Sequence, residues 1–363
     1  MSEKARRRAI AGQLNANRAS IAASVTEEFL ERHPDWLERF PQARRRGEED
    51  AAFHLEFLAG AILADETSAF ADYARWTCRV LSARGIAPEF LAENLEQVGQ
   101  ASAAVLDAPD WPIVERFVAA GVAAVEQVEQ GQAPPGAASE PRESFPDDHV
   151  RTARSLYLQS VLSGERRAAV GVALEAVRSG MSVPDVYLEI LQPVQHEIGR
   201  MWERNEVTVA TEHMATAISQ YVVASLYPHL EIPDVSRGNA IVTGVRGELH
   251  QLGANMVSDV LEADGWNMRF LGTQLPHASV LEAIAEHEPR LVGISATVLS
   301  SLHAVAELIE DARTAFGSDI RIVVGGSAFG ANPDSWSLVG ADGYGRDLRD
   351  AVRAADELVP RGS

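Results

Sequence analysis

Cysteine is almost absent from this chain: Cys78 is the single thiol among 363 residues. One thiol excludes an intrachain disulfide framework and a zinc site built from cysteines. Long apolar runs are missing as well, since none approaches the ~18 residues of a membrane span. The N-terminus, Met1-Ser2-Glu3-Lys4, lacks the apolar core of a secretory signal. These absences predict a soluble, cytoplasmic protein without a membrane partner.

Positive charge is also scarce. The chain has 32 lysines and arginines against 52 aspartates and glutamates, which gives a formal net charge of −20. A protein that binds duplex nucleic acid needs a basic surface, so we expect no direct nucleic-acid partner. Two short basic runs, Arg6-Arg7-Arg8 and Arg44-Arg45-Arg46, are more typical of solvated helix faces.

The length predicts two or three domains, each large enough to bury a core. Residues 1–130 have apolar side chains at helical spacing, interrupted near prolines, and predict an all-α domain. Residues 131–148 are rich in Pro, Gly, Ala, Ser and Glu, which is typical of a linker. Residues 149–232 contain four more helical segments with short connections, which favour a four-helix bundle. Residues 358–363 match the remnant of a cleavable tag.

The pattern changes to alternating strands and helices over residues 238–357. Five apolar segments predict strands at Ala240–Val245, Asn267–Leu271, Leu291–Ala296, Ile320–Val324 and Gly343-Tyr344. Helical segments lie between them. This alternation predicts an α/β domain with a doubly wound, parallel, flavodoxin-like sheet.

The segment Glu248-Leu249-His250-Gln251-Leu252-Gly253 follows the first of these strands. It therefore lies at the carboxyl edge of the sheet, where such folds bind ligands. A lone histidine is more often structural than a ligand, but here Glu248 can accept the second ring N–H of His250. That contact would fix the tautomer and make the other ring nitrogen a better metal donor.

Together with Ser295-Ala296-Thr297 and Gly325-Gly326 after later strands, this segment resembles the cobalamin-binding signature of methionine-synthase-like domains. The resemblance implies that His250 is the lower axial ligand of cobalt and replaces the cofactor's own base. It implies that Gly253, Gly325 and Gly326 admit the displaced nucleotide tail, and that Ser295 and Thr297 offer it hydroxyls. Taken alone, the two adjacent glycines would indicate only a tight turn.

The predicted bundle adds Trp202 near the end of its third helix and Glu212-His213 at the start of its fourth. The short connection allows all three side chains to face one cavity. Their spacing resembles the upper-face signature of light-sensing adenosylcobalamin proteins, which implies that Trp202 and Glu212 lie against the adenosyl group with His213 close by. The alternative is a core tryptophan and a surface Glu-His pair.

One position departs from that signature. Many of these sensors carry a histidine directly after the tryptophan that captures cobalt after photolysis, but this chain has Glu203. The upper ligand after photolysis stays open between His213, His196 and water.

In the N-terminal domain, Arg46, Asp50 and His54 share one helix face, and Tyr73, Trp76 and Arg79 lie on the next helix. The stretch from Gly47 to Leu55 resembles the bilin-bearing helix of globin-like phycobiliproteins, which implies a globin-like fold for this domain. Because Gly47 stands where the anchoring thiol would be, the resemblance implies a non-covalent bilin. A buried stripe with a hydrogen-bonded histidine, or haem ligation by His54, are the alternatives.

A helical bilin domain before a cobalamin core is similar to the photocobilins, which pair cobalamin with biliverdin. The resemblance implies a light sensor rather than an enzyme, with a domain or quaternary rearrangement after Co–C photolysis. We expect a homo-oligomer whose oligomeric state depends on light. An unidentified signalling partner is a further expectation. The alternatives are a corrinoid methyl carrier of a methyltransferase system and a cobalamin sensor without photochemistry.

Overall fold

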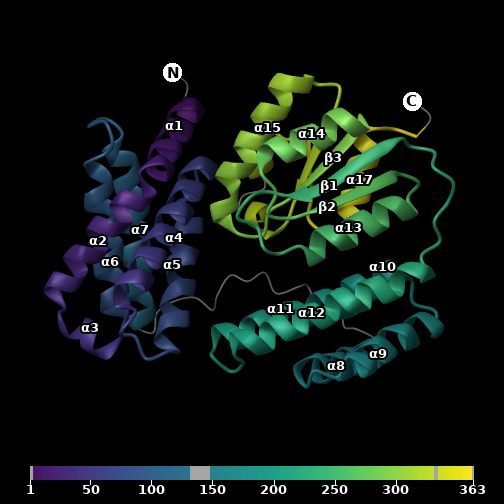
Figure 1. Cartoon of the computed structure of the whole chain (residues 1–363), viewed down its shortest axis with the longest axis horizontal. Helices are drawn as coiled ribbons and strands as arrows, with labels where there is room; N and C mark the ends of the chain where they lie inside the picture. Colours follow the sequence, from purple (N-terminus) through teal and green to yellow (C-terminus); the bar gives the residue numbers. More distant parts are fainter. Residues whose placement is uncertain (1–2, 131–147, 331–333, 362–363) are drawn as a thin grey trace. The chain divides into compact units, whose positions relative to one another are not determined.

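A computed structural model describes residues 3–130, 148–330 and 334–361 (Figure 1). The predicted linker lies outside these ranges except for Asp148. The described chain divides into two compact units, and each is treated by itself below. The first contains the N-terminal helices together with residues 298–306 and 334–339, and the second contains the bundle and the five-stranded sheet.

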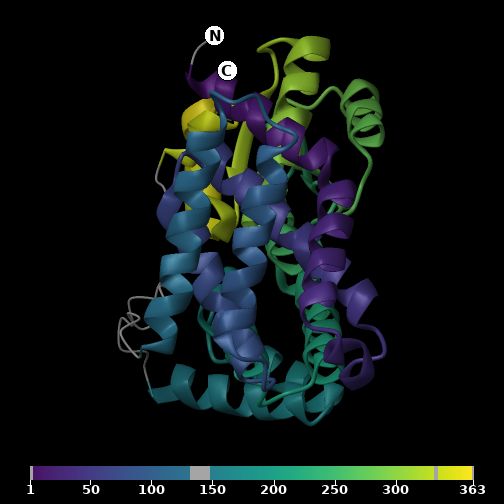
Figure 2. The ribbon, with the colours of Figure 1, turned by 90° about the vertical axis from the view of Figure 1, so that its left-hand side faces the viewer.

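The N-terminal region is helical, as predicted, and its helices are drawn in purple and blue in Figure 2. Their bounds are α1 Glu3–Ala16, α2 Arg18–Arg32, α3 Asp35–Arg39, α4 Ala43–Ala64, α5 Thr67–Ser82, α6 Pro88–Ala103 and α7 Trp111–Glu129. Proline sets several of the boundaries: Pro88 is the first residue of α6 and Pro112 the second of α7, positions where its missing N–H costs no helical hydrogen bond. In the described part of the chain, no helix is long and apolar enough to cross a membrane.

The core of this unit lies between α4, α5 and α7. Leu58 and Ile62 of α4 are fully buried, as are Phe70 of α5 and Phe117 of α7. Close approach of α5 and α7 depends on Gly121, because a Cβ there would lie 2.7 Å from the Phe70 ring. The buried stripe on α4 therefore forms part of a continuous core.

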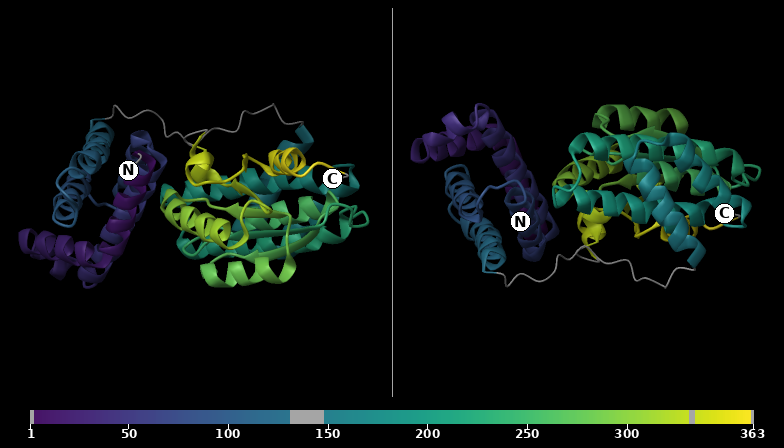
Figure 3. Two further views of the ribbon diagram at one scale, coloured as in Figure 1. Left: turned by 90° about the horizontal axis from the view of Figure 1, so that it is seen from above. Right: turned by 90° about the horizontal axis from the view of Figure 1, so that it is seen from below.

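The bundle follows as α8 Asp148–Leu162, α9 Arg166–Arg178, a third helical stretch and α12 Val209–Leu226, which Figure 3 shows in teal. The third stretch is not the uniform helix that the sequence predicts. It consists of α10 Val183–Val186, the π-turn η1 Tyr187–Leu191 and α11 Gln192–Glu203. Pro193 explains the irregularity, since it cannot donate to the carbonyl of Glu189. Arg154 donates to that carbonyl instead and pairs with the Glu189 carboxylate at 2.8 Å.

The last domain confirms the predicted parallel sheet. Its strands are β1 Asn239–Gly244, β2 Asn267–Gly272, β3 Leu291–Ser295, β4 Arg321–Gly325 and β5 Gly343–Gly345, in the order β2-β1-β3-β4-β5. The helices between them are α13 Leu252–Ala263, α14 His277–His287, α15 Leu302–Phe316, α16 Ser335–Leu338 and α17 Leu348–Leu358. In Figure 1, α14 and α15 lie on one side of the sheet and α13 and α17 on the other.

The ends of the strands are in register. Ser295 at the end of β3 pairs with Gly244 of β1 on one side and with Gly325 of β4 on the other. Gly325 in turn pairs with Gly345 of β5. The loops that carry the predicted binding residues therefore all start from one edge.

Within the second unit, the bundle packs against α13 and the start of α17. Met256 and Leu348 belong to the buried core of the bundle. The hydroxyl of Tyr187, in the π-turn, donates to the buried carboxylate of Asp259 at 2.7 Å. Arg349 pairs with Asp185 at 2.6 Å. Apolar and polar contacts thus hold the bundle beside the sheet.

Candidate functional site

Glu248 and His250 stand on the loop between β1 and α13, at the carboxyl edge of the sheet. The Glu248 side chain is fully buried, whereas the His250 side chain is 58% exposed. One oxygen of Glu248 accepts from Nδ1 of His250 at 2.7 Å and from the His250 backbone N–H at 2.8 Å. The other accepts from the backbone N–H of Thr297 at 2.6 Å.

These hydrogen bonds keep Glu248 ionised although it is buried. Burial alone raises its pKa, but the bonds from the His250 side chain and from the backbone N–H groups of Thr297 and His250 outweigh burial. The net result is a lowered pKa. A buried, ionised carboxylate with three donors is a rigid anchor for the histidine above it.

The anchor also fixes which nitrogen of His250 is offered to a ligand. With Nδ1–H donating to Glu248, Nε2 is the nitrogen that carries the lone pair in the neutral ring. The pKa of His250 is raised, first by its hydrogen bond to Glu248, against an opposing effect of burial, and further by the charges of Glu248 and Glu212. The site therefore presents a basic, oriented imidazole.

Two glycines near this edge differ in what surrounds the position that a Cβ atom would occupy. Gly326 has φ +99°, and a Cβ there would lie 2.2 Å from the carbonyl oxygen of Ala296, so the protein's own backbone requires it. Gly253 is the second residue of α13, and a Cβ there would meet nothing within 4 Å. This open space lies in the first turn of α13, directly after the loop that carries His250. It fits a ligand better than an internal packing role.

Ser295, Thr297 and Gly325 complete the edge. Ser295 and Gly325 are paired strand ends. The carbonyl of Thr297 accepts from the Ser327 hydroxyl at 2.7 Å, and its N–H is bound to Glu248. The loop after β3 is thereby tied to the loop after β1.

The bundle brings Glu212 and His213 into the first turns of α12, after the capping residue Thr208. Nδ1 of His213 bonds to one oxygen of Glu212, and the hydroxyl of Thr216 donates to the other at 3.0 Å. Glu212 contributes to the raised pKa of His250, so the two groups lie within electrostatic range of each other.

Trp202 is half-buried in the last turn of α11, and the His213 side chain is 75% exposed. Trp202 is therefore only partly enclosed, and the exposure of His213 agrees with the surface Glu-His pair of the alternative interpretation. Sequence reasoning missed Thr216, whose spacing of four residues from Glu212 on one helix was the available signal.

In the first unit, His54 is buried, and its Nδ1 lies 2.6 Å from the hydroxyl of Tyr73. Burial lowers the pKa of His54 to about 4. Tyr73 stacks on Phe57 with ring centroids 3.9 Å apart. Arg46 and Asp50 are exposed on α4, whereas Trp76 and Arg79 are half-buried on α5. His54 thus has the geometry of the hydrogen-bonded core alternative, and the side chains of Arg46 and Asp50 on α4 are exposed.

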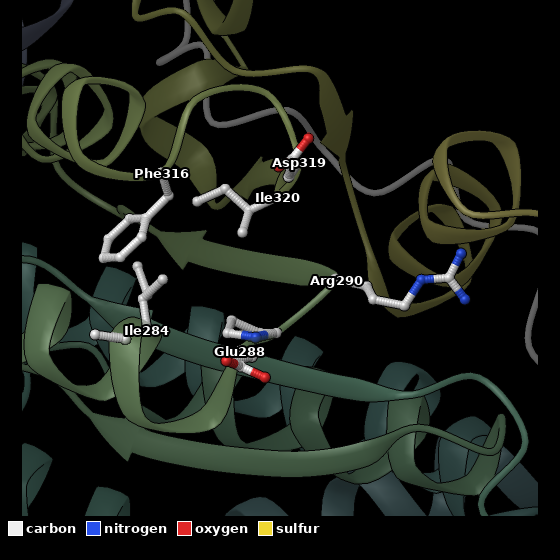
Figure 4. Close-up of a pocket in the computed structure, with 8 residues that line it drawn as sticks. Ile284, Glu288, Arg290, Phe316, Asp319 and Ile320 are labelled. Atoms are coloured by element: carbon white, nitrogen blue, oxygen red, sulfur yellow. The ribbon is translucent and has the colours of Figure 1, made fainter.

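A cavity of about 430 Å³ lies at the opposite edge of the sheet (Figure 4). Arg290 directly precedes β3 and Ile320 directly precedes β4. The residues that line this cavity are Ile284, Ala285, Glu288, Pro289, Arg290, Phe316, Asp319 and Ile320. It contains none of the predicted site residues.

The predicted site offers few protein ligands. Among residues 3–130, 148–330 and 334–361, no group of three or more His, Cys, Asp or Glu side chains could hold a bare metal ion. A single exposed imidazole suits a metal that brings most of its coordination sphere in an organic cofactor.

Comparison with known families agrees with this chemistry. Residues 238–353 match the model described as B12 binding domain, and residues 154–227 match a second model of the same description. The bundle and the sheet are thus matched separately, and helices α1–α7 lie outside both matches.

Two curated proteins and one solved structure illustrate the similarity. Dimethylamine corrinoid protein 3 of Methanosarcina acetivorans is 25% identical over 190 residues, 52% of this chain and 88% of that protein. Methionine synthase of Mycobacterium tuberculosis is 22% identical over 208 residues, 55% of this chain and 17% of that protein. The monomethylamine corrinoid protein of Methanosarcina barkeri has a TM-score of 0.51 at 20% identity, covering 57% of this chain and 99% of that one. The last similarity concerns the fold alone.

Proposed function

We propose that this chain, whose residues 154–227 and 238–353 belong to the B12-binding domain families, is a light sensor that holds adenosylcobalamin above His250. Adenosylcobalamin supplies a cobalt–carbon bond that visible light can break. The residues of the chain bind the cofactor, orient it and respond to its change.

The lower side of the proposed site rests on the pair of Glu248 and His250. Glu248 holds Nδ1, so Nε2 of His250 is the nitrogen available to cobalt. Gly253 leaves open space beside it for the displaced nucleotide tail, and Gly325, Gly326, Ser295 and Thr297 lie at the neighbouring strand ends. These residues fit a base-off cofactor whose own base is replaced by the protein's histidine.

The observations that carry the sensor proposal are the hydrogen bond between His213 and Glu212 in the first turns of α12 and the position of Trp202 in the last turn of α11, one short connection away. A bulky indole and an oriented carboxylate can contact the apolar and polar parts of an adenosyl group. Loss of that group would remove those contacts and bias the bundle towards another packing. A change of oligomeric state, or the binding of a signalling partner, would report it.

We propose that the N-terminal helices bind a second chromophore, biliverdin, non-covalently. Phe57 and Trp76 supply partly exposed aromatic rings next to the buried Tyr73, while Arg46 and Arg79 could pair with propionates and Asp50 with pyrrole N–H groups. His54 is engaged with Tyr73, so haem ligation would require that hydrogen bond to rearrange. Helices α1–α7 lie outside the matched B12-binding segments, so they add a module to the B12-binding core.

The second candidate is a corrinoid methyl carrier of a methyltransferase system. The names of the similar proteins favour it over the sensor, because they include dimethylamine corrinoid proteins matched over about nine-tenths of their length. A carrier must expose the upper side of cobalt to its partners, whereas in the sensor proposal Trp202 and Glu212 would cover that side. A cobalamin sensor without photochemistry is the third candidate. None of the three roles makes the chain itself an enzyme.

Two assays, one with light and one with a methyl acceptor, separate the candidates. The full chain, loaded in the dark with adenosylcobalamin, is illuminated with green light and followed by absorption spectroscopy and gel filtration. A sensor changes both its spectrum and its elution. A carrier loaded with methylcobalamin transfers the methyl group to a thiol in the presence of its methyltransferase. An unchanged spectrum together with unchanged elution after illumination would contradict the photosensor proposal, whereas unchanged elution alone would count against self-association.

A further inference from the structure

A continuous chain of side-chain hydrogen bonds runs from Glu212 into the core of the bundle. Thr216 lies with its hydroxyl oxygen 3.0 Å from Oε1 of Glu212 and 3.1 Å from Oε1 of Gln195. The amide of Gln195 donates to the hydroxyl of Ser219 at 2.5 Å, and the hydroxyl of Tyr157 donates to the same oxygen at 2.9 Å. The chain thus joins helices α8, α11 and α12.

The inner end of this chain cannot exchange partners with water. Tyr157 and Ser219 are both fully buried. Breaking a bond there leaves a buried polar group without a partner, which costs more than the bond itself contributes. In the structure the amide of Gln195 has its nitrogen towards Ser219 and its oxygen towards Thr216.

The outer end has a different property. The hydroxyl of Thr216 has one hydrogen, but the oxygens of Gln195 and Glu212 are both acceptors within reach. The hydrogen can satisfy only one of them fully at a time. Because Glu212 is 29% exposed, another donor can reach its carboxylate, whereas Gln195 has Thr216 as the donor for its oxygen.

From this geometry we infer that Thr216 positions Glu212 and makes the upper side of the site selective for cobalt ligands that carry hydrogen-bond donors. When the hydroxyl or amino groups of such a ligand donate to Glu212, the Thr216 hydrogen turns to Gln195 and strengthens the link between α11 and α12. A methyl group has no donor and leaves the hydrogen shared. Thr216, Gln195 and Ser219 are thus positioning residues for the upper ligand, an inference that rests on the proposed function only for the identity of the cofactor.

The test compares the affinity of adenosylcobalamin with that of methylcobalamin in the dark, in the full chain. Thr216→Val keeps the shape of the side chain and removes the hydroxyl. We expect the Kd for adenosylcobalamin to rise about tenfold and that for methylcobalamin to change by less than about twofold. Thr216→Ser restores the hydroxyl and should restore the preference.

Two further variants complete the design. Ser219→Ala removes the partner of Gln195 without touching Glu212 and should lose part of the same preference. Thr152→Val removes a hydroxyl that bonds only to a carbonyl of its own helix and should change neither affinity. Equal weakening of both cobalamins by Thr216→Val, no weakening of either, or failure of Thr216→Ser to restore the preference would overturn the inference. If Thr216→Val loses this preference but the wild-type protein shows no response to light, the sensor proposal is overturned and the inference stands.

Discussion

The buried carboxylate of Glu248 holds two groups of His250 with one oxygen: the ring Nδ1 at 2.7 Å and the backbone N–H at 2.8 Å. Its second oxygen holds the backbone of Thr297, on the loop after β3. The orientation of the proposed cobalt ligand is therefore coupled to the shape of the sheet edge that would receive the nucleotide tail. A change in Glu248 should disturb both.

The first prediction concerns this pair. We expect His250→Ala to abolish the spectrum of a base-off, histidine-bound cobalamin, because the ligand is lost. Glu248→Gln should weaken cobalamin binding about 10- to 100-fold, since an amide cannot accept from all three donors. Titration of the apoprotein with hydroxocobalamin, followed by absorption, measures both. The control is His287→Ala, which removes another histidine beside a glutamate. Unchanged binding in His250→Ala would contradict the proposed ligand.

The two glycines at the edge should respond in opposite ways to the same substitution. Gly326→Ala should destabilise the chain by about 2 kcal/mol or more, because the new Cβ meets the Ala296 carbonyl at a positive φ. Gly253→Ala should leave the thermal midpoint unchanged or slightly raised, since alanine favours a helix by about 0.5–1 kcal/mol. Its cobalamin affinity should nevertheless fall. Normal affinity in Gly253→Ala would show that the open space there is not used by the ligand.

The contact between the bundle and the sheet domain should depend on pH through Asp259. Burial raises the pKa of Asp259 to about 6, and the charge of Glu262 adds to the effect, although the hydrogen bond from Tyr187 opposes both. The folded state thus takes up this proton more readily than the unfolded state between about pH 4 and 6. The free energy of unfolding should therefore gain up to about 3 kcal/mol from this group as the pH falls from above 6 to 4.

Asp259→Asn tests this dependence because it removes the titrating group and keeps an acceptor for Tyr187. Calorimetry should find the variant more stable than the wild type at pH 7, with the difference narrowing at pH 5. The exposed Glu282, replaced by Gln, serves as the control. A difference that is the same at both pH values would argue against the buried carboxyl as its source.

The N-terminal helices yield a prediction about the second chromophore. If biliverdin binds beside α4 and α5, Asp50→Asn should shift or weaken its absorption band, while the cobalamin spectrum stays unchanged. Asp72→Asn, on α5 but paired with Arg75, is the matched control. His54→Gln distinguishes a bilin from haem. The substitution would remove a haem ligand and abolish haem binding, but it would only perturb the absorption of a bilin. Absence of any bilin band in the wild type would refute this part of the proposal.

Short-range patterns predicted much of the fold. The alternation of apolar segments located all five strands to within a residue or two, and the prolines marked several helix boundaries. The π-turn before α11 could not be predicted, because it depends on Arg154 reaching the carbonyl that Pro193 leaves without a donor. That partner lies on α8, far away in the sequence.

The sequence by itself determined the order of the elements and, through the Glu-x-His spacing, the link between a histidine and its carboxylate. Such features depend on neighbours within a few residues, so periodicity and spacing reveal them. Only the tertiary structure decided that Glu248 is fully buried and holds Thr297, and that Glu212 lies within electrostatic range of His250. The same holds for the link from Thr216 through Gln195 to Tyr157. Burial and donor–acceptor pairing depend on which distant segments meet, and packing settles that.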